Sequence, residues 1–233
     1  MHLTVRDVAR ALQVSEKTLH RWITQRGLPA HHIENQYRFN ASELLELATA
    51  QGHQISPDLL QPGGAAPLPR FSAALAAGGV HYSLPGGDKQ TVLTRVVSLL
   101  RLPPDIDRAA FLQVLLAREA AGSTAIGDGI AIPHVRNPIV MRIPAPAVTL
   151  CFLEQPVDFD AIDGKPVHTL FTLVTPTVRE HLHLLSFLGY VLRDEGFKSA
   201  LRRQAPPHEI VTEVARAEAD IARATPQSPR EDE

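Results

Sequence analysis

The sequence predicts an α/β protein in which a mixed β-sheet is flanked by helices, preceded by a small and mainly helical N-terminal domain. Apolar residues recur at helical spacing in several segments after residue 68, and two β-rich apolar runs lie between those segments, at 147–153 and 167–174. A proline- and glycine-rich stretch, 53–67, has the composition of a linker. The expected organisation is an N-terminal domain at 1–52, a linker at 53–67, an α/β domain at 68–216 and a flexible polar tail at 217–233.

Length and charge set the first limits on function. The chain has 233 residues, of which 44% are hydrophobic, which suits one large or two modest globular domains. The formal net charge of -2 gives no overall attraction to nucleic acid or membranes, so any DNA-binding surface must be local. No run of eighteen apolar residues is present, and the single cysteine, Cys151, lies in an apolar run as a small buried hydrophobe. We therefore expect a cytoplasmic protein without membrane insertion.

The N-terminal domain is expected to begin with two short helices within residues 3–26. Thr4 with Asp7 can cap the first helix, and Ser15 can cap the second by accepting a hydrogen bond from a backbone N–H. The break between the helices is only a few residues long. That length suits a helix-turn-helix, in which the second helix is the candidate for the major groove of DNA.

A small hairpin, or wing, and a third helix are expected to complete this domain. Asn40 with Glu43 gives the third helix a capping-box-like start, and Gly52 ends it. The order helix-turn-helix, wing, helix resembles the winged DNA-binding domains of the MerR and excisionase group. The phrases that carry this resemblance are Leu3-Thr4-Val5-Arg6-Asp7-Val8-Ala9, Thr18-Leu19-His20-Arg21-Trp22-Ile23, Gly27-Leu28-Pro29 and Tyr37-Arg38-Phe39.

The predicted DNA contacts lie on the second helix and the wing. They are Lys17, Thr18, His20 and Arg21 on the helix and Arg38 on the wing. Nearby glutamates almost balance the basic residues, so one copy should attract DNA weakly, and a homodimer would read two half-sites. The alternative is that these are solvated charges on a module that docks onto another protein.

Three helices are expected at the start of the α/β domain. They run from Phe71 to Leu75 before Gly78-Gly79, from Asp88 through Leu100 to the stop at Pro103-Pro104, and from Asp105–Asp107 to Arg118. A constrained stretch follows at 123–134, where glycines, a short apolar strand and Pro133 precede His134. The two β-rich runs come next and are expected to share one sheet, with a turn at Asp163-Gly164; helices follow after Pro176 and from His208 to Ala217.

The stretch around His134 also carries a family resemblance. The phrases Ala117-Arg118-Glu119, Ser123-Thr124 and Gly127-Asp128-Gly129-Ile130-Ala131-Ile132-Pro133-His134 resemble the active-site signature of phosphotransferase-system IIA domains of the fructose/mannitol type, which include the nitrogen-regulatory branch. The resemblance covers roughly residues 68–216 and implies the IIA fold. It also implies that His134 is the phosphoacceptor, that His181 is a second active-site histidine, and that Arg118 lies beside the phosphoacceptor.

Each of these residues suits phosphoryl transfer, and each also has a structural alternative. A histidine with a pKa of about 6.5 is mostly neutral in the cytoplasm and can attack phosphorus, but His134 could instead be a hydrogen-bonded structural residue. Arg118 could hold phosphate oxygens, or it could only be an arginine at a helix C-terminus that interacts favourably with the helix dipole. His181 could have only a structural role, in capping its helix or in packing. Thr124 is a weaker phosphate-binding candidate. His134, His181 and His183 have no close carboxylate or thiolate, so neither a metal nor a cofactor is expected.

The leading functional hypothesis is a phosphorylation-responsive regulator that accepts phosphate on His134 from an HPr-type phosphocarrier and binds DNA through its N-terminal domain. The competing hypothesis is a IIA phosphocarrier that passes phosphate to a separate IIB protein, with the N-terminal domain as a docking module. A third possibility is a scaffold that works without phosphorylation, against which the joint presence of His134, Arg118 and His181 argues.

Overall fold

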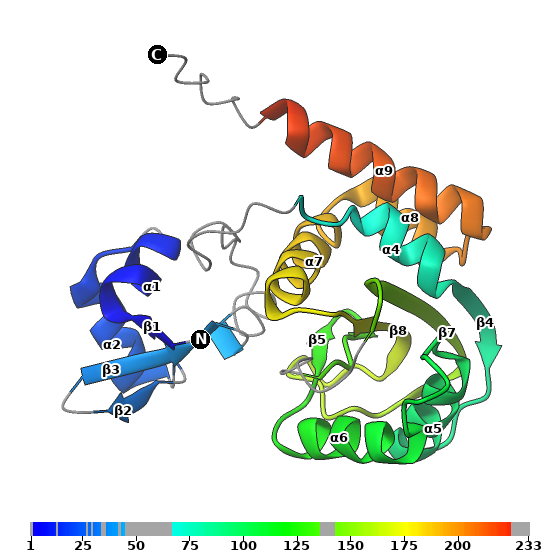
Figure 1. Ribbon diagram of the computed structural model, residues 1–233, viewed down its shortest axis with the longest axis horizontal. Helices are drawn as coiled ribbons and strands as arrows, with labels where there is room; N and C mark the ends of the chain where they lie inside the picture. The colour runs from blue at the N-terminus through cyan, green and yellow to red at the C-terminus, as the bar shows by residue number, and fades with distance from the viewer. Residues whose placement is uncertain are drawn as a thin grey trace.

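The computed structural model describes residues 2–12, 14–26, 28, 30–33, 36–41, 43–44, 67–135 and 143–224. Figure 1 shows the small N-terminal domain and the larger α/β domain that follows it. No helix in these ranges is long and apolar enough to cross a membrane. The predicted linker at 53–67 lies outside the described residues, apart from Pro67.

The N-terminal domain combines a helix-turn-helix with a three-stranded antiparallel sheet in the order β1-β3-β2. Its elements are β1 (His2–Thr4), α1 (Val5–Ala11), α2 (Glu16–Arg26), β2 (His31–Ile33) and β3 (Gln36–Asn40). The predicted caps of α1 and α2 are confirmed: Thr4 and Asp7 form a capping box on α1, and the Thr18 N–H donates to Ser15 Oγ over 3.1 Å. The buried Val8, Leu19 and Phe39 join its helices to its sheet.

The predicted wing is the β2–β3 hairpin, and a helix follows it. β3 continues to Asn40, and the described residues Ala41, Glu43 and Leu44 are helical. The remainder of the predicted third helix, including its expected end at Gly52, lies outside the described residues.

The α/β domain is built on a five-stranded sheet in the order β4-β7-β8-β6-β5. The sheet is mixed, as the sequence predicted. β7 pairs antiparallel with β8, whereas β4 runs parallel to β7 and β6 runs parallel to β8. In chain order the elements are α4 (Phe71–Gly78), β4 (Val80–Leu84), α5 (Lys89–Leu99), α6 (Arg108–Ala120), β5 (Ala125–Gly127), β6 (Ile130–Ala131), β7 (Ala147–Val157), β8 (Val167–Val174), α7 (Val178–Val191), α8 (Glu195–Arg202) and α9 (Pro207–Ala224).

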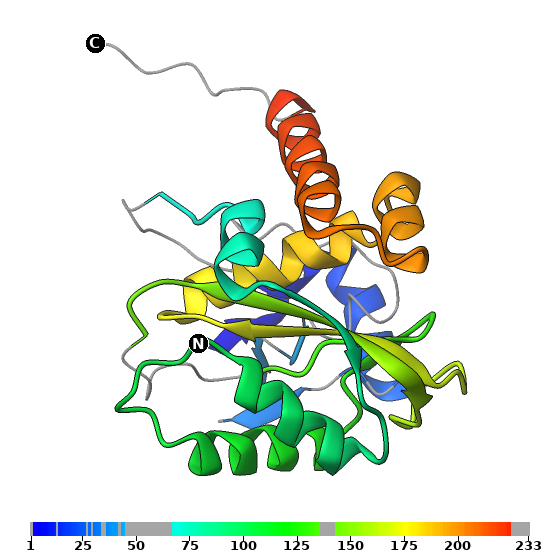
Figure 2. The ribbon, with the colours of Figure 1, turned by 90° about the vertical axis from the view of Figure 1, so that its right-hand side faces the viewer.

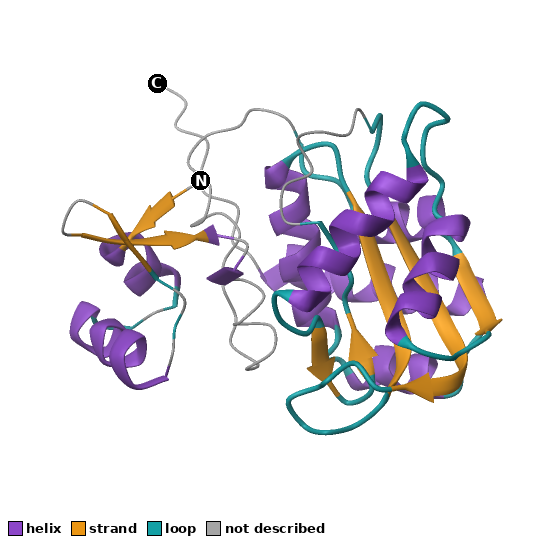
Figure 3. Cartoon of the chain, turned by 90° about the horizontal axis from the view of Figure 1, so that it is seen from below, coloured by secondary structure: helices purple, strands orange, loops and turns teal. Residues whose placement is uncertain are grey.

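Helices cover both faces of this sheet, because alternate residues of the central strands point to opposite sides. In β7, Val148, Leu150 and Phe152 belong to the core shared with α4, α7, α8 and α9. The intervening Cys151 and Leu153 belong to the core shared with α5 and α6. Figures 2 and 3 show the sheet between these two helical layers.

The structure corrects the sequence-based expectations in three places. Strand β4 and helix α8 were not predicted. Helix α9 continues beyond Ala217 to Ala224, so the first part of the expected flexible tail is helical, and Ala217 itself is buried.

The two ends of the α/β domain are joined at Glu218 of α9. Its carboxylate accepts hydrogen bonds from the Ser72 backbone N–H (3.2 Å), the Ser72 hydroxyl (2.5 Å) and Arg70 Nε (3.3 Å). These contacts fix the start of α4 against the C-terminal helix.

Candidate functional site

His134 lies at the carboxyl ends of the parallel strands β6 and β8. It follows β6 after Ile132 and Pro133, and its backbone forms a parallel bridge to Leu173 near the end of β8. Only 2% of the residue is exposed. The imidazole is therefore held by the sheet, consistent with the constraint that Pro133 was expected to impose.

A hydrogen bond to the backbone defines which ring nitrogen can react. His134 Nδ1 lies 2.6 Å from the Ile132 carbonyl oxygen. Because a carbonyl oxygen only accepts hydrogen bonds, Nδ1 must carry the proton. In the neutral ring the lone pair is then on Nε2, which is the nitrogen available as a nucleophile.

The structure brings His181 close to His134. His181 lies in the first turn of α7, where its N–H donates to the Thr177 carbonyl over 3.0 Å. The centroids of the two imidazole rings are 5.0 Å apart and their planes are inclined by 35°. His181 is 1% exposed, so two buried imidazoles meet where β6, β8 and α7 converge.

Arg118 occupies the last turn of α6, where its Nη1 donates to the Gly122 carbonyl over 2.8 Å. This is a bond that an arginine at a helix C-terminus commonly makes. It places Arg118 at the beginning of the connection to β5. A role for its guanidinium in holding phosphate stays a prediction.

Thr124 is directed toward Glu119, a residue that the sequence did not single out by itself. The Thr124 N–H and hydroxyl both donate to Glu119 Oε2, over 3.0 Å and 2.6 Å. Both donors of Thr124 are therefore engaged, and a phosphate-binding role for Thr124 stays a prediction. Glu119 stands in the quoted motif, but no role for it was predicted, because a glutamate in a last helical turn is ordinarily solvated.

A tight turn connects β5 to β6 just before the site. Gly127, Asp128 and Gly129 have φ values of 95°, 51° and 71°, in the left-handed region. A Cβ at Gly129 would lie 2.4 Å from the His168 ring, so glycine is required there by space as well as by conformation.

The Asp128 N–H donates to Asp163 Oδ2 over 2.9 Å. This hydrogen bond is the main cause that holds the pKa of Asp163 below its ordinary value. Lys165 Nζ also lies 2.8 Å from Asp128, which ties the turn to the loop before β8. The turn is thus fixed from outside the site.

The predicted DNA-contacting residues lie on α2 and on β3. Lys17, His20 and Arg21 are exposed on α2, while Thr18 is partly buried and its hydroxyl lies 2.9 Å from Ser15 Oγ. Arg38 lies on the central strand β3, in register with Thr4 and His31. The geometry therefore gathers Lys17, His20 and Arg21 on one helix and leaves DNA contact by all five residues a prediction.

Two family models match the chain, one for each domain. Residues 75–216 match the model described as phosphoenolpyruvate-dependent sugar phosphotransferase system, EIIA 2. Residues 3–52 match a helix-turn-helix domain.

Several known proteins are similar to the larger domain. A nitrogen regulatory protein of Pseudomonas aeruginosa is 37% identical over 148 residues, covering 62% of this chain and 94% of that protein. One from Bradyrhizobium diazoefficiens is 33% identical over 129 residues, covering 54% of this chain and 82% of that protein. The crystal structure of the nitrogen regulatory protein IIA-Ntr from Neisseria meningitidis aligns with a TM-score of 0.55 at 28% identity, over 62% of this chain and 98% of that one.

Proposed function

Since this chain belongs to the EIIA type-2 family of the phosphoenolpyruvate-dependent sugar phosphotransferase system, we propose that it is a phosphorylation-responsive regulator that accepts a phosphoryl group on His134. The observation that carries the proposal is the 2.6 Å bond between His134 Nδ1 and the Ile132 carbonyl, which leaves Nε2 as the nucleophile. The nearby His181 and the similarity to nitrogen regulatory proteins support it.

In this mechanism the donor is the phosphohistidine of an HPr-type phosphocarrier. The lone pair of His134 Nε2 attacks phosphorus, a new N–P bond forms, and the N–P bond of the donor breaks with its electron pair returning to the donor imidazole. The Nδ1 proton of His134 stays in place on the Ile132 carbonyl, so the step needs no separate proton acceptor. His181 and Arg118 would supply hydrogen-bond donors and positive charge to the transferred group.

Phosphorylation in vitro tests this proposal directly. The full chain is incubated with phosphoenolpyruvate, enzyme I and a phosphocarrier, either HPr or its nitrogen-branch counterpart. We expect an acid-labile, alkali-stable phosphate that is lost in His134→Ala and kept in His208→Gln, a matched change of an exposed histidine on α9. Phosphate that persists in His134→Ala, or no transfer from any carrier, would contradict the proposal.

We further propose that the N-terminal domain binds DNA through α2. The exposed Lys17, His20 and Arg21 provide a local basic surface on the second helix of a helix-turn-helix. Selection of bound sequences from a random DNA pool should give enrichment that weakens with salt and is lost in a Lys17→Ala/Arg21→Ala double variant. Enrichment that is absent, or unaffected by the double variant, would favour a module that docks onto protein.

The alternative is transfer of the phosphate to a IIB protein. It is favoured by the similarity of 125 residues, at 30% identity, to the fructose-specific EIIABC component of Bacillus subtilis, although they span only 19% of that protein. Chasing phosphorylated chain with a purified IIB protein separates the two functions. Rapid transfer to IIB together with no DNA enrichment would select the phosphocarrier.

A further inference from the structure

We propose that Glu119 is a positioning residue for His134. The geometry points to a buried path of hydrogen bonds that leads from this carboxylate to the reactive imidazole. The effect on phosphoryl transfer rests on the function proposed above, whereas the effect on the imidazole itself does not.

The path begins at a carboxylate that the fold has buried. Glu119 occupies the last turn of α6 and its side chain is 5% exposed. Burying a carboxylate is costly unless donors and a positive charge compensate it. Glu119 has both, because Thr124 donates twice to Oε2 and Lys89 Nζ lies 3.4 Å from Oε1.

From Thr124 the path continues through the backbone to the site. The Ile132 N–H donates to the Thr124 carbonyl over 3.0 Å, and the Ile132 carbonyl accepts from His134 Nδ1 over 2.6 Å. Thr124 is 5% exposed and Ile132 is 2% exposed, so water does not compete freely for these bonds. Glu119 thus fixes Thr124, Thr124 fixes Ile132, and the Ile132 carbonyl orients the imidazole and selects its tautomer.

Lys89 anchors the other side of the carboxylate. It is the first residue of α5, and its Nζ bridges Glu119 and Asp160 at 3.4 Å and 2.5 Å. The carboxylate is therefore held between α5 and the connection to β5. This placement suits the alignment of a reacting group, for which a small displacement slows reaction strongly.

The chain contains a matched control in Glu218. This carboxylate also accepts from the N–H and the hydroxyl of one residue, Ser72, and also pairs with a cation, Arg70. Its side chain is 12% exposed, and its helix α9 carries none of the residues of the candidate site. A change at Glu218 removes the same set of bonds without touching the path to His134.

The experiment compares Glu119→Ala, Glu119→Gln and Glu218→Ala in the full chain. Nitrogen-15 chemical shifts of His134 report its tautomer, and initial rates of phosphorylation are measured with the phosphocarrier and with phosphoramidate, a small donor that needs no docking. Glu119→Ala should mix the two tautomers and slow both reactions about tenfold or more. Glu119→Gln should restore most of the rate, because its amide oxygen can still accept from Thr124, and Glu218→Ala should leave tautomer and rate unchanged.

The outcomes separate this inference from the proposed function. If wild-type chain is not phosphorylated, the proposed function fails, and the nitrogen-15 shifts still decide the positioning role. If Glu119→Ala folds and keeps the wild-type tautomer and rate, Glu119 does not position His134. The same conclusion follows if Glu218→Ala loses as much of the rate as Glu119→Ala does. If Glu119→Ala does not fold, Thr124→Val takes its place, since it removes only the hydroxyl bond, and the same shift in tautomer is expected.

Discussion

At the residue scale, the thiol of Cys151 shows how completely the sheet excludes solvent. Cys151 lies in the middle of β7, has no exposed surface, and belongs to the core shared with α5 and α6. Burial raises the pKa of this thiol to about 12. The sequence-based expectation of a small buried hydrophobe is confirmed.

We predict that Cys151 reports unfolding. A thiol reagent at pH 8 should leave the native chain unlabelled and should label one thiol per chain in denaturant. The folded thiol holds its proton up to a pH of about 12, whereas the unfolded thiol ionises near its ordinary value of 9.0, so stability should fall as the pH rises above 9.0. Rapid labelling of the native chain at pH 8 would contradict the burial of this residue.

The two histidines of the candidate site were easier to identify from the sequence than the residues packed around them. His134 and His181 were identified from short motifs, and the structure places their rings 5.0 Å apart. Glu119 stands in the same motif, but its contact with Thr124 exists only because the chain turns back and presents both donors of Thr124 to it. That turn is a property of the fold, and no periodicity in the sequence encodes it.

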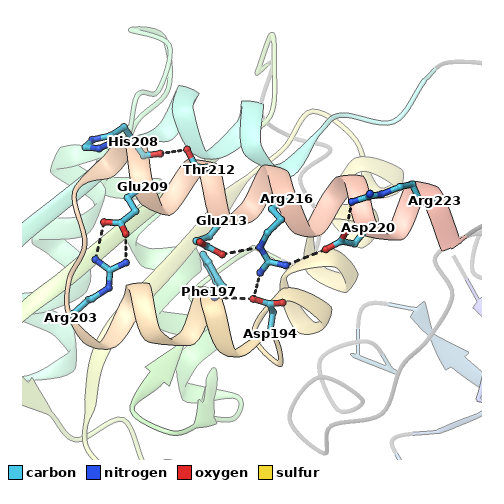
Figure 4. A network of polar contacts seen from close by, with 10 residues as sticks. All are labelled: Asp194, Phe197, Arg203, His208, Glu209, Thr212, Glu213, Arg216, Asp220 and Arg223. Atoms are coloured by element: carbon cyan, nitrogen blue, oxygen red, sulfur yellow. Dashed lines mark hydrogen bonds and ion pairs between the residues drawn. The ribbon is translucent and has the colours of Figure 1, made fainter.

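At the element scale, α8 and α9 are joined by an apolar contact and a set of surface ion pairs. The apolar contact belongs to a buried cluster that includes Phe197 and Leu201 of α8 and Ile210 of α9. Figure 4 shows Arg216 of α9 between Glu213, Asp220 and Asp194, which also caps α8 by accepting from the Phe197 N–H over 2.9 Å. This cap is the first cause, and Arg216 a further one, that holds the pKa of Asp194 below its ordinary value. A second pair, Arg203 with Glu209, closes the turn between the helices.

We predict that the apolar contact contributes more to stability than the ion pairs. The Arg216 side chain is 43% exposed, so Arg216→Ala should lower the free energy of unfolding by no more than about 1 kcal/mol. Ile210→Ala, at a fully buried position of the same helix, should lower it by about 2–5 kcal/mol.

Urea denaturation at low salt and at about 1 M salt is the measurement, because exposed ion pairs are screened and buried contacts are not. An Arg216→Ala loss that equals the Ile210→Ala loss and survives high salt would overturn this ranking.

Helices with caps were easier to predict than short or edge elements. Helices α5 and α6 begin where expected, and Asp88 and Asp107 cap them. Strand β4 was missed because it lies at the sheet edge, pairs with β7 alone, and carries exposed residues within Val80–Leu84. Helix α8 has only eight residues and contains Gly196, so its apolar period is too short to distinguish from a loop.

At the scale of the whole molecule, the fold class followed from the sequence and the strand order did not. The runs at 147–153 and 167–174 were expected to share a sheet, and they pair as β7 and β8. The position of β6 beside β8 depends on a parallel pairing between strands that are far apart in the chain. Such pairing is decided by packing against helices on both faces, which local patterns do not record.

The contact of Glu218 with Ser72 also has a consequence for how the domain folds. This hydrogen bond joins residues 146 positions apart in the sequence. Forming it requires the ends of nearly the whole domain to be brought together, which costs conformational entropy. Folding rates of small domains fall as the mean sequence separation of their contacts rises, and this pair raises that mean. The same closure brings the first and last helices of the domain together, which is the arrangement that tolerates circular permutation. A chain cut after residue 216 would lose the contact of Glu218 with Ser72, and the start of α4 would fray.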